Sequence, residues 1–262
     1  KTNYIMKSKS NKNKKNKFNT VDLSSDSELI NRKKIIQLFK DCPIPDDELL
    51  WNLGLFINRQ LFSRIMFMYN LYIKCLEVHG VVMEFGARWG QNLALFQNFR
   101  GILEPFNHNR KIIGFDTWEG FPGTSSQDPT NIKARDYGAT KDYEKYLEEL
   151  LQYHETESPI SHIKKYQLIK GDISNTLQQY LEENPETIIS FAYFDLDLYK
   201  PTKDCLRLIK GHLTKGSVLG FDQLNDGDFP GETIALKEVF GLDKFEIQRS
   251  PISPLQSYII IK

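Results

Sequence analysis

From residue 81 to the end of the chain, short apolar runs alternate with amphipathic stretches, and this alternation constrains the fold more than any other feature. Strands that recur between helical stretches are typical of a parallel sheet with helices on both faces. The expected parallel strands are Val81–Phe85, Lys111–Phe115, Tyr166–Lys170, Ile188–Phe194 and Ser217–Phe221. The helices expected to follow them are Gln91–Arg100, Tyr143–Tyr153, Thr176–Glu183, Thr202–His212 and Glu232–Phe240.

Two further strands, Phe245–Arg249 and Tyr258–Ile261, are expected near the C-terminus. The segment between them holds Pro251 and Pro254 and is too short for a crossover helix, so these strands should pair antiparallel. The sequence therefore predicts an α/β fold with a Rossmann-like sheet that is mostly parallel and ends in an antiparallel hairpin.

The N-terminal part of the chain does not follow this alternation. Residues 1–20 are rich in Lys and Asn and low in complexity, which predicts a flexible basic tail. Residues 21–79 are expected to form a helical extension, whose first helix is capped by Ser24 or Ser25. Residues 80–262 are expected to form the main domain.

Composition excludes some classes of partner. The chain has 34 basic and 34 acidic residues, and this balance gives no overall field that would favour nucleic acid or an anionic membrane. No apolar run approaches the roughly 18 residues that a membrane span needs, and no signal peptide is apparent. The three cysteines are far apart in the sequence, which fits a reducing compartment, so a cytoplasmic location is expected. Homo-oligomerisation is left open.

Two glycines follow the first expected strand. Gly86 and Gly90 bracket a tight turn ahead of a helix, where glycine lets the backbone approach a ligand closely. A buried strand, a glycine turn and a helix N-terminus form the first half of a nucleotide-binding crevice. The pattern is E-x-G-x-x-x-G rather than G-x-G-x-x-G, so a turn without a ligand is an equally good interpretation of this motif alone.

Acidic residues follow four neighbouring strands. Ligands of open α/β sheets bind at the carboxyl ends of the strands, where these acids should gather. A single acid there is readily explained as a helix cap, but a set of four indicates a binding site. The set consists of Asp116, Asp172, Asp195 with Asp197, and Asp222. Glu84, within the first strand, is a further acid near the same edge of the sheet.

Residues after the second and third expected strands suggest contacts with an adenosine. Asp116 ends the second strand and is suited to accept hydrogen bonds from a ribose diol. Asp172 could receive an adenine amino group, with Ile173 packing on the ring, or it could simply cap the following helix. Trp118 and Phe121 lie in an expected exposed loop and could cover the adenosine.

The fourth and fifth strands suggest a metal site. Asp195 and Asp222 end adjacent strands, and Gln223 adds a carbonyl oxygen beside the second. Carboxylate and amide oxygens suit Mg²⁺ or a similar divalent ion, and the absence of His and Cys at these positions argues against zinc. Asp197 would bind the ion as well or orient Asp195.

The motifs EFGxxxG, DTWEGFP, KGD and DLDLYKPT, with an acid after the fifth strand, together resemble the macrocin O-methyltransferase family. The resemblance covers about residues 81–240. It implies a class I methyltransferase sheet, S-adenosylmethionine and Mg²⁺ as cofactors, and a hydroxyl of a sugar or natural-product intermediate as the acceptor. It places the methionine part at Glu84, Gly86 and Gly90, the ribose at Asp116, the adenine at Asp172, and the metal at Asp195 and Asp222. Arg88, Thr117, Trp118 and Ile173 complete the candidate cofactor residues.

One residue departs from the family pattern. Gln223 stands where the family usually has a second Asp, and a neutral ligand would hold the ion less firmly. Catechol-type methyltransferases, which are similar in layout, use Asn there, so an amide is chemically acceptable. A catechol or another small molecule is therefore an alternative acceptor.

Methyl transfer to oxygen needs a proton acceptor. Asp195 is the best-placed candidate for the catalytic base, and His162 and His212 are weaker ones. Two other classes of function remain as alternatives. A nicotinamide oxidoreductase would predict a G-x-G-x-x-G turn and no clustered acids, and a non-catalytic methyltransferase-like interaction domain is supported by Gln223 and the basic tail alone.

The segment of about residues 121–163 is too long for a simple connection, since such links usually have about 2–6 residues. Its first part is turn-rich and should be mobile, and its second part should form a helix beside the mouth of the crevice. We expect this segment to act as a lid that excludes water from the reaction. The alternative is a surface elaboration that caps the edge of the sheet.

Overall fold

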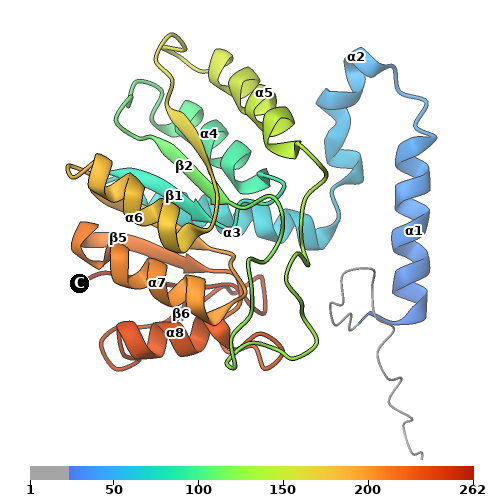
Figure 1. Ribbon diagram of the computed structural model, residues 1–262. Helices are drawn as coiled ribbons and strands as arrows, with labels where there is room; N and C mark the ends of the chain where they lie inside the picture. The colour runs from blue at the N-terminus through green and yellow to red at the C-terminus, as the bar shows by residue number, and fades with distance from the viewer. Residues whose placement is uncertain (1–23) are drawn as a thin grey trace, which may run out of the picture. The chain divides into compact units, whose positions relative to one another are not determined.

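The structure is a computed structural model that describes residues 24–262, so the expected tail of residues 1–20 lies outside the described part. The chain forms two compact units, which divide between Ile57 and Asn58 (Figure 1). The smaller unit consists of α1 (Asp26–Lys40), α2 (Asp46–Leu49) and the 3-10 helix η1 (Leu50–Phe56). Ser25 caps α1 through a capping box with Glu28, which confirms one of the two expected caps.

The larger unit is built on a seven-stranded sheet. Its strands are β1 (Val81–Phe85), β2 (Ile112–Asp116), β3 (Tyr166–Lys170), β4 (Ile189–Phe194), β5 (Leu213–Phe221), β6 (Gln248–Arg249) and β7 (Ser257–Ile260). They lie in the order β3-β2-β1-β4-β5-β7-β6. The first five strands run parallel, while β7 is antiparallel to both β5 and β6. The expected mixed sheet with its C-terminal antiparallel pair is confirmed.

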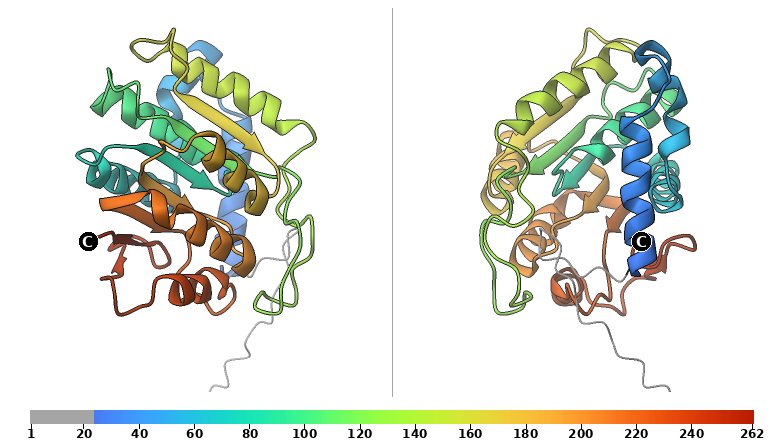
Figure 2. Two further views of the ribbon diagram at one scale, coloured as in Figure 1. Left: turned by 60° about the vertical axis from the view of Figure 1, so that its left-hand side comes forward. Right: turned by 90° about the vertical axis from the view of Figure 1, so that its right-hand side faces the viewer.

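Helices cover both faces of this sheet (Figures 1 and 2). They are α3 (Arg59–Cys75), α4 (Gln91–Leu103), α5 (Tyr143–Thr156), α6 (Ile173–Glu183), α7 (Tyr199–Ile209) with the 3-10 turn η2 (Lys210–His212), and α8 (Gly231–Val239). Helix α3 therefore belongs to the same compact unit as the sheet. Among the helices of residues 24–262, none has both the length and the apolar content of a membrane span.

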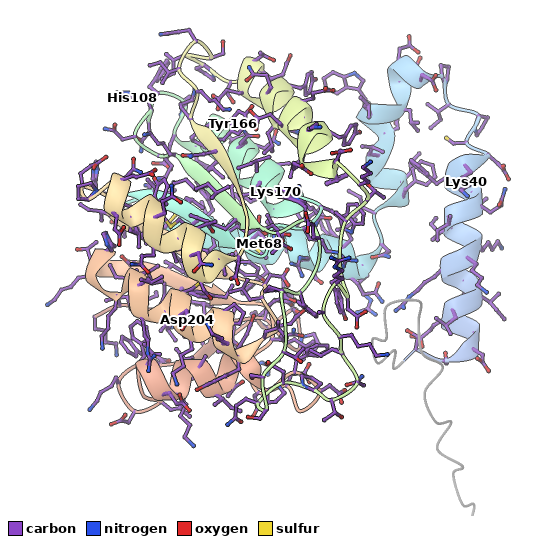
Figure 3. All side chains as sticks on the ribbon, viewed as in Figure 1. Lys40, Met68, His108, Tyr166, Lys170 and Asp204 are labelled. Atoms are coloured by element: carbon purple, nitrogen blue, oxygen red, sulfur yellow. The ribbon has the colours of Figure 1, made fainter. Side chains whose placement is uncertain are left out.

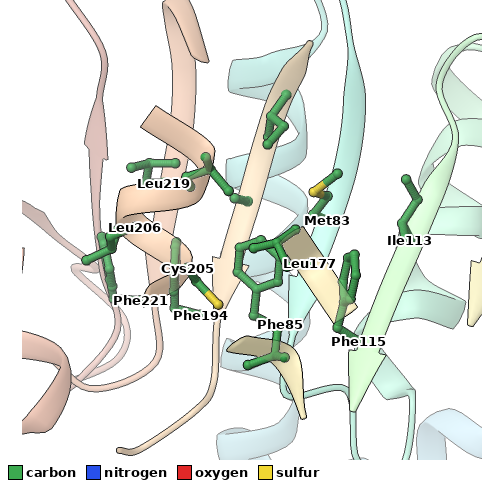
Figure 4. Close-up of a cluster of buried hydrophobic side chains, with 14 of the residues drawn as sticks. Met83, Phe85, Ile113, Phe115, Leu177, Phe194, Cys205, Leu206, Leu219 and Phe221 are labelled. Carbon is green, nitrogen blue, oxygen red and sulfur yellow. The ribbon is translucent and has the colours of Figure 1, made fainter. Parts of the chain in front are cut away.

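The strands bury alternate residues in two separate cores, as the twofold period of a strand requires. Met83 and Phe85 belong to a core that also contains residues of α6, α7 and α8, and Figure 4 shows them with Leu177 of α6 and with Cys205 of α7. Val82 points to the opposite face and packs against α3, α4 and α5. Met68 of α3 lies fully buried in this second core (Figure 3). Because the central strands are covered on both faces, their sequences read as continuous apolar runs.

The register of the central strands positions the site. Phe85 of β1 pairs with Phe194 of β4, which in turn pairs with Phe221 of β5. The residue after each of these phenylalanines therefore leaves the sheet at the same edge. These next residues are Gly86, Asp195 and Asp222.

Candidate active site

A cavity of about 450 Å³ opens at the carboxyl ends of the central strands. The segments that follow the five parallel strands line it, together with α3. The candidate residues that line it are Glu84, Gly86, Arg88, Gly90, Asp116, Thr117, Ile173, Asp195, Asp197, Asp222 and Gln223. Trp118 and Asp172, although both are described, are not among the lining residues. The structure thus brings most of the candidate residues together at one cavity.

The glycine turn brings the backbone to the cavity. Gly86 has a φ of 93°, and a Cβ at this position would lie 2.0 Å from the carbonyl oxygen of Asp195, so only glycine fits. Gly90, with a φ of 73°, is the N-cap of α4 and provides no side-chain cap. The N–H groups at the start of α4 are therefore left for a ligand.

Backbone amides fix the carboxylate of Asp116. The N–H of Arg88 donates to its Oδ2 at 2.8 Å, and the N–H of Trp118 donates to its Oδ1 at 2.5 Å. Burial raises the pKa of Asp116, while these hydrogen bonds act in the opposite direction. Each oxygen keeps a second lone pair, so the carboxylate can still accept hydrogen bonds from a ligand such as a ribose.

Glu84 is an incompletely paired acid in the wall of the cavity. Its Oε1 accepts a hydrogen bond of 2.6 Å from Asn92 Nδ2, but its Oε2 is buried without a hydrogen-bond partner in the described part of the chain. Burial raises the pKa of Glu84 well above its usual value. A cationic donor on a ligand would satisfy this oxygen and favour the ionised carboxylate.

The expected exposure of Trp118 is wrong. Its side chain is 3% exposed, and its Nε1 donates a hydrogen bond of 2.8 Å to the carbonyl oxygen of Arg88. Trp118 therefore stabilises the glycine turn through this hydrogen bond and does not line the cavity. Phe121 does line it. Asp172 caps α6 by accepting from Ser174 N–H, which is the simpler of its two expected roles.

Arg88 and Thr117 also have clear local roles. The guanidinium of Arg88 lies over the rings of Trp89 and Tyr137, at 5.5 and 5.1 Å from their centroids, at the wall of the cavity. The Thr117 hydroxyl donates to the carbonyl oxygen of Gly120 at 2.6 Å and so closes the turn after β2. Both side chains shape the wall beside Asp116.

Arg64 of α3 bridges the two acids that end β4 and β5. Its Nη2 donates to Asp195 Oδ2 at 2.8 Å, and its Nη1 donates to Asp222 Oδ1 at 2.7 Å. Burial disfavours the charged guanidinium, but the carboxylates outweigh this effect and raise the pKa of Arg64 above its usual value. Arg64 was not among the residues predicted for the site. The available signal was a charged side chain within the apolar run of α3.

Burial and the neighbouring Asp222 carboxylate raise the pKa of Asp195 to about 7, although Arg64 acts in the opposite direction. A carboxylate with such a pKa is suited to accept a proton near neutral pH. Asp222 Oδ1 also accepts hydrogen bonds from Tyr193 OH at 2.7 Å and from Gln256 Nε2 at 3.1 Å. Asp222 is therefore held by side chains from three different elements.

Gln223 is oriented by two further acids. Its Nε2 donates a hydrogen bond to Asp197 Oδ1, and its backbone N–H donates to Glu232 Oε2 at 3.3 Å. Burial raises the pKa of both Asp197 and Glu232 well above the usual values. Because the amide nitrogen is engaged by Asp197, the amide oxygen is available as a ligand.

The oxygen atoms of Asp195, Asp222 and Gln223 form a donor set that fits a hard divalent ion, with water as the remaining ligands. Both carboxylates, however, are engaged by Arg64 in this structure. Within residues 24–262, no cluster of three or more His, Cys, Asp or Glu side chains is suited to a metal ion. A metal site here would therefore depend on the Gln223 amide.

The two histidines considered as weaker bases lie elsewhere. His212 of η2 interacts through Nδ1 with the carbonyl oxygen of Thr187 at 2.9 Å. His162 lies exposed between α5 and β3. Neither lines the cavity, so Asp195 is the candidate base that the fold positions.

The long segment after β2 runs past the carboxyl ends of the central strands (Figures 1 and 2). Phe121, Pro122 and Tyr137 of this segment line the cavity. Asp128 is buried and accepts a hydrogen bond of 2.7 Å from Tyr199 N–H at the start of α7. The carboxylate of Asp128 thus ties the turn-rich loop to the start of α7.

Solved structures resemble this chain over most of its length. The crystal structure of CalS11, a calicheamicin methyltransferase, has 41% sequence identity and a TM-score of 0.87, over 90% of this chain and 93% of that one. The apo structure of CalS11, a TDP-rhamnose 3'-O-methyltransferase of calicheamicin biosynthesis, has 38% identity and a TM-score of 0.81, over 90% and 95% of the two chains.

A more distant match is the O-methyltransferase NovP, with 13% identity and a TM-score of 0.59 over 76% of this chain and 80% of that one. At this level of identity it supports the fold alone. No family model and no curated protein matches the chain.

Proposed function

Because the chain belongs to the macrocin O-methyltransferase family and is an S-adenosylmethionine-dependent O-methyltransferase, we propose that it methylates a hydroxyl group of a sugar in natural-product biosynthesis. The observation that carries this proposal is the 41% identity to CalS11, which extends over 90% of the chain. CalS11 is itself described as acting on a nucleotide-linked sugar, TDP-rhamnose. A nucleotide sugar is therefore the first acceptor to test.

The cofactor side of the cavity supports a specific binding mode. Glu84 Oε2, which has no hydrogen-bond partner among residues 24–262, would accept hydrogen bonds from the amino group of S-adenosylmethionine, beside the N-terminus of α4. The fixed carboxylate of Asp116 would accept from the ribose. Ile173 would pack on the adenine, while Asp172 contributes by capping α6.

The acid side supports a divalent cation, for which Mg²⁺ is our proposal. Asp195, Asp222 and the amide oxygen of Gln223 would hold it. When bound, such an ion lowers the pKa of a coordinated hydroxyl and fixes its position. Asp197 would keep the Gln223 oxygen available by holding the amide nitrogen.

The protein's own contribution to the reaction is alignment and proton removal. The cofactor supplies a methyl group on a sulfonium, which is a good leaving group, so the acceptor oxygen has to be held in line with it. Asp195 faces the cavity and would take the proton of the acceptor. Phe121 and Tyr137 both line the cavity, and their rings would help to exclude water from the reaction.

The test is a methyl-transfer assay with purified enzyme, labelled S-adenosylmethionine and a panel of acceptors. The panel contains TDP-rhamnose, other nucleotide sugars, glycosylated metabolites and a catechol, each with and without EDTA. We expect labelled product from a sugar acceptor, and loss of product in EDTA. Transfer to the catechol alone would replace the sugar proposal, and full activity in EDTA would remove the metal from it.

A cytoplasmic location remains a prediction. It is supported by the three cysteines, Cys42, Cys75 and Cys205, all of which are free thiols. Cell fractionation with an antibody against the chain would test it.

A further inference from the structure

Arg64 occupies the position between the two carboxylates that a shared cation would take. Its two terminal nitrogens donate to different acids, one to Asp195 and one to Asp222. The guanidinium carbon therefore lies between the two carboxylates rather than beside one of them. An ion ligated by both acids would need the same space, so the two cations exclude each other.

The charges of this cluster favour such an exchange. Asp195 and Asp222 carry two negative charges when ionised, and a single guanidinium leaves one of them uncompensated. A divalent ion would neutralise both carboxylates. Burial strengthens every charge interaction here, because the Arg64, Asp195 and Asp222 side chains are 26%, 27% and 17% exposed.

The anchoring of Arg64 also permits it to leave. It projects from α3, its guanidinium donates to these two acids, and its central carbon lies 6.0 Å from the centroid of the Tyr193 ring. Asp222 keeps Tyr193 and Gln256 as donors when the arginine departs, so its carboxylate stays in place for a metal. The wall of the cavity includes Arg64 itself, which gives the side chain open space to move into.

We propose that Arg64 is an internal competitor of the divalent cation: its guanidinium holds the two carboxylates together until the ion displaces it. This inference rests on the metal part of the proposed function. It assigns Arg64 two effects. In the metal-free protein it prevents repulsion between the acids, and in the presence of metal it lowers the apparent affinity for the ion.

The test measures binding of Mn²⁺ alone, by electron paramagnetic resonance of the unbound ion, to the metal-free full chain without cofactor or acceptor. Arg64→Met removes the charge and keeps a long apolar side chain. We expect this variant to bind Mn²⁺ at least ten times more tightly than the wild type. Arg59→Met is the matched control, because Arg59 is an exposed arginine in the first turn of the same helix. It should leave Mn²⁺ binding unchanged.

Thermal unfolding supplies a second measurement. In EDTA, Arg64→Met should unfold at a lower temperature than the wild type, because the acids then repel each other. Saturating Mn²⁺ should raise its midpoint by more than it raises that of the wild type. Arg64→Lys keeps the charge but cannot bridge two carboxylates with a planar fork, so its Mn²⁺ affinity should lie between the two. This variant also serves as the test if Arg64→Met fails to fold.

The possible outcomes distinguish the proposal that Arg64 competes with the cation from the proposal that a metal site exists. Equal or weaker Mn²⁺ binding by Arg64→Met and Arg64→Lys, alongside measurable binding by the wild type, overturns the competitor and leaves the metal site standing. Binding by the variants with none detectable in the wild type supports it most strongly. If no form binds Mn²⁺, the competitor and the metal proposal both fail, and methyl transfer in EDTA then decides whether the rest of the proposed function stands.

Discussion

The two sides of the cavity are held in place by different parts of the chain. We call Glu84, Gly86, Gly90 and Asp116 the cofactor region, and Arg64, Asp195, Asp222 and Gln223 the acid region. In the cofactor region, the hydrogen bonds on Glu84 and Asp116 come from residues 8 and 28 positions away. In the acid region, the bonds of Arg64 span 131 and 158 positions.

The difference determines what each side can do. Backbone N–H groups of Arg88 and Trp118 hold Asp116, and they cannot move without unfolding the turns after β1 and β2. Ion pairs between the Arg64 side chain and two carboxylates hold the acid region, and a carboxylate can exchange a guanidinium for another cation. We therefore expect the cofactor region to have the same geometry before and after the cofactor binds. The acid region, in contrast, should change its contacts when a cation binds.

The largest effect should come from the acid region. Asp195→Asn and Asp222→Asn should each reduce methyl transfer by about 10²–10⁴-fold, since each removes a charge that acts on the acceptor. Calorimetry should show binding of S-adenosylhomocysteine unchanged, because the acids do not belong to the cofactor region. Asp228→Asn, in the exposed loop after β5, is the control and should keep full activity. A loss of cofactor binding in either acid variant would contradict the division.

The next effect concerns the cofactor region. Asp116→Ala should weaken S-adenosylhomocysteine binding by about 1.5–3 kcal/mol, the range for hydrogen bonds to a charged group. Calorimetry measures this change, and Mn²⁺ binding by the same variant should stay as in the wild type. Glu119→Ala removes a largely exposed acid from the same segment and serves as the control. Unchanged cofactor affinity in Asp116→Ala would remove this residue from the cofactor region.

A smaller effect would sharpen the assignment of Gln223. Gln223→Asp replaces an amide oxygen by a carboxylate, and the added charge should tighten Mn²⁺ binding on the order of tenfold. Titration with Mn²⁺ measures the change, and Gln178→Asp, the same substitution at an exposed position of α6, is the control. If Gln223→Asp binds Mn²⁺ as the wild type does, Gln223 is not a ligand.

The cofactor region could be predicted from the sequence because it is local. The glycine turn and Asp116 appear as a motif, and β3 has the same bounds that the apolar pattern predicted. The family resemblance, which is confirmed by the similarity to CalS11, could be recognised because its motifs are local segments of the sequence. Helix α7 begins at Tyr199, earlier than predicted, because Pro201 is tolerated in the first turn of a helix.

The acid region could be predicted only in part. The register of β4 and β5 brings Asp195 and Asp222 together as expected, but no local pattern indicates that Arg64 joins them. Trp118 was misjudged for a related reason. An aromatic residue in a turn-rich segment suggests exposure, and only the packing against α4 and α5 shows that it is buried.

The smallest expected effect concerns the loop that spans both regions. Asp128 holds this loop by accepting hydrogen bonds from Tyr199 N–H at 2.7 Å and, within the loop, from Ser125 N–H at 2.6 Å. Asp128→Ala should lower the free energy of unfolding by about 0.5–2 kcal/mol, as for the loss of a helix cap, and should raise KM a few-fold. Ser126→Ala, an exposed position in the same loop, is the control.

Hydrogen exchange decides whether this loop is a lid. In the wild type, residues 122–137 should gain protection when S-adenosylhomocysteine binds, because Phe121 and Tyr137 flank this stretch and line the cavity. In Asp128→Ala, these residues should exchange faster without ligand, and ligand should restore only part of the protection. If protection does not change on binding in the wild type, the loop only caps the edge of the sheet. Asp128 then contributes to stability alone. The contact between the cofactor region and the acid region is in that case the close approach of Gly86 to the backbone of Asp195, without a contribution from the loop.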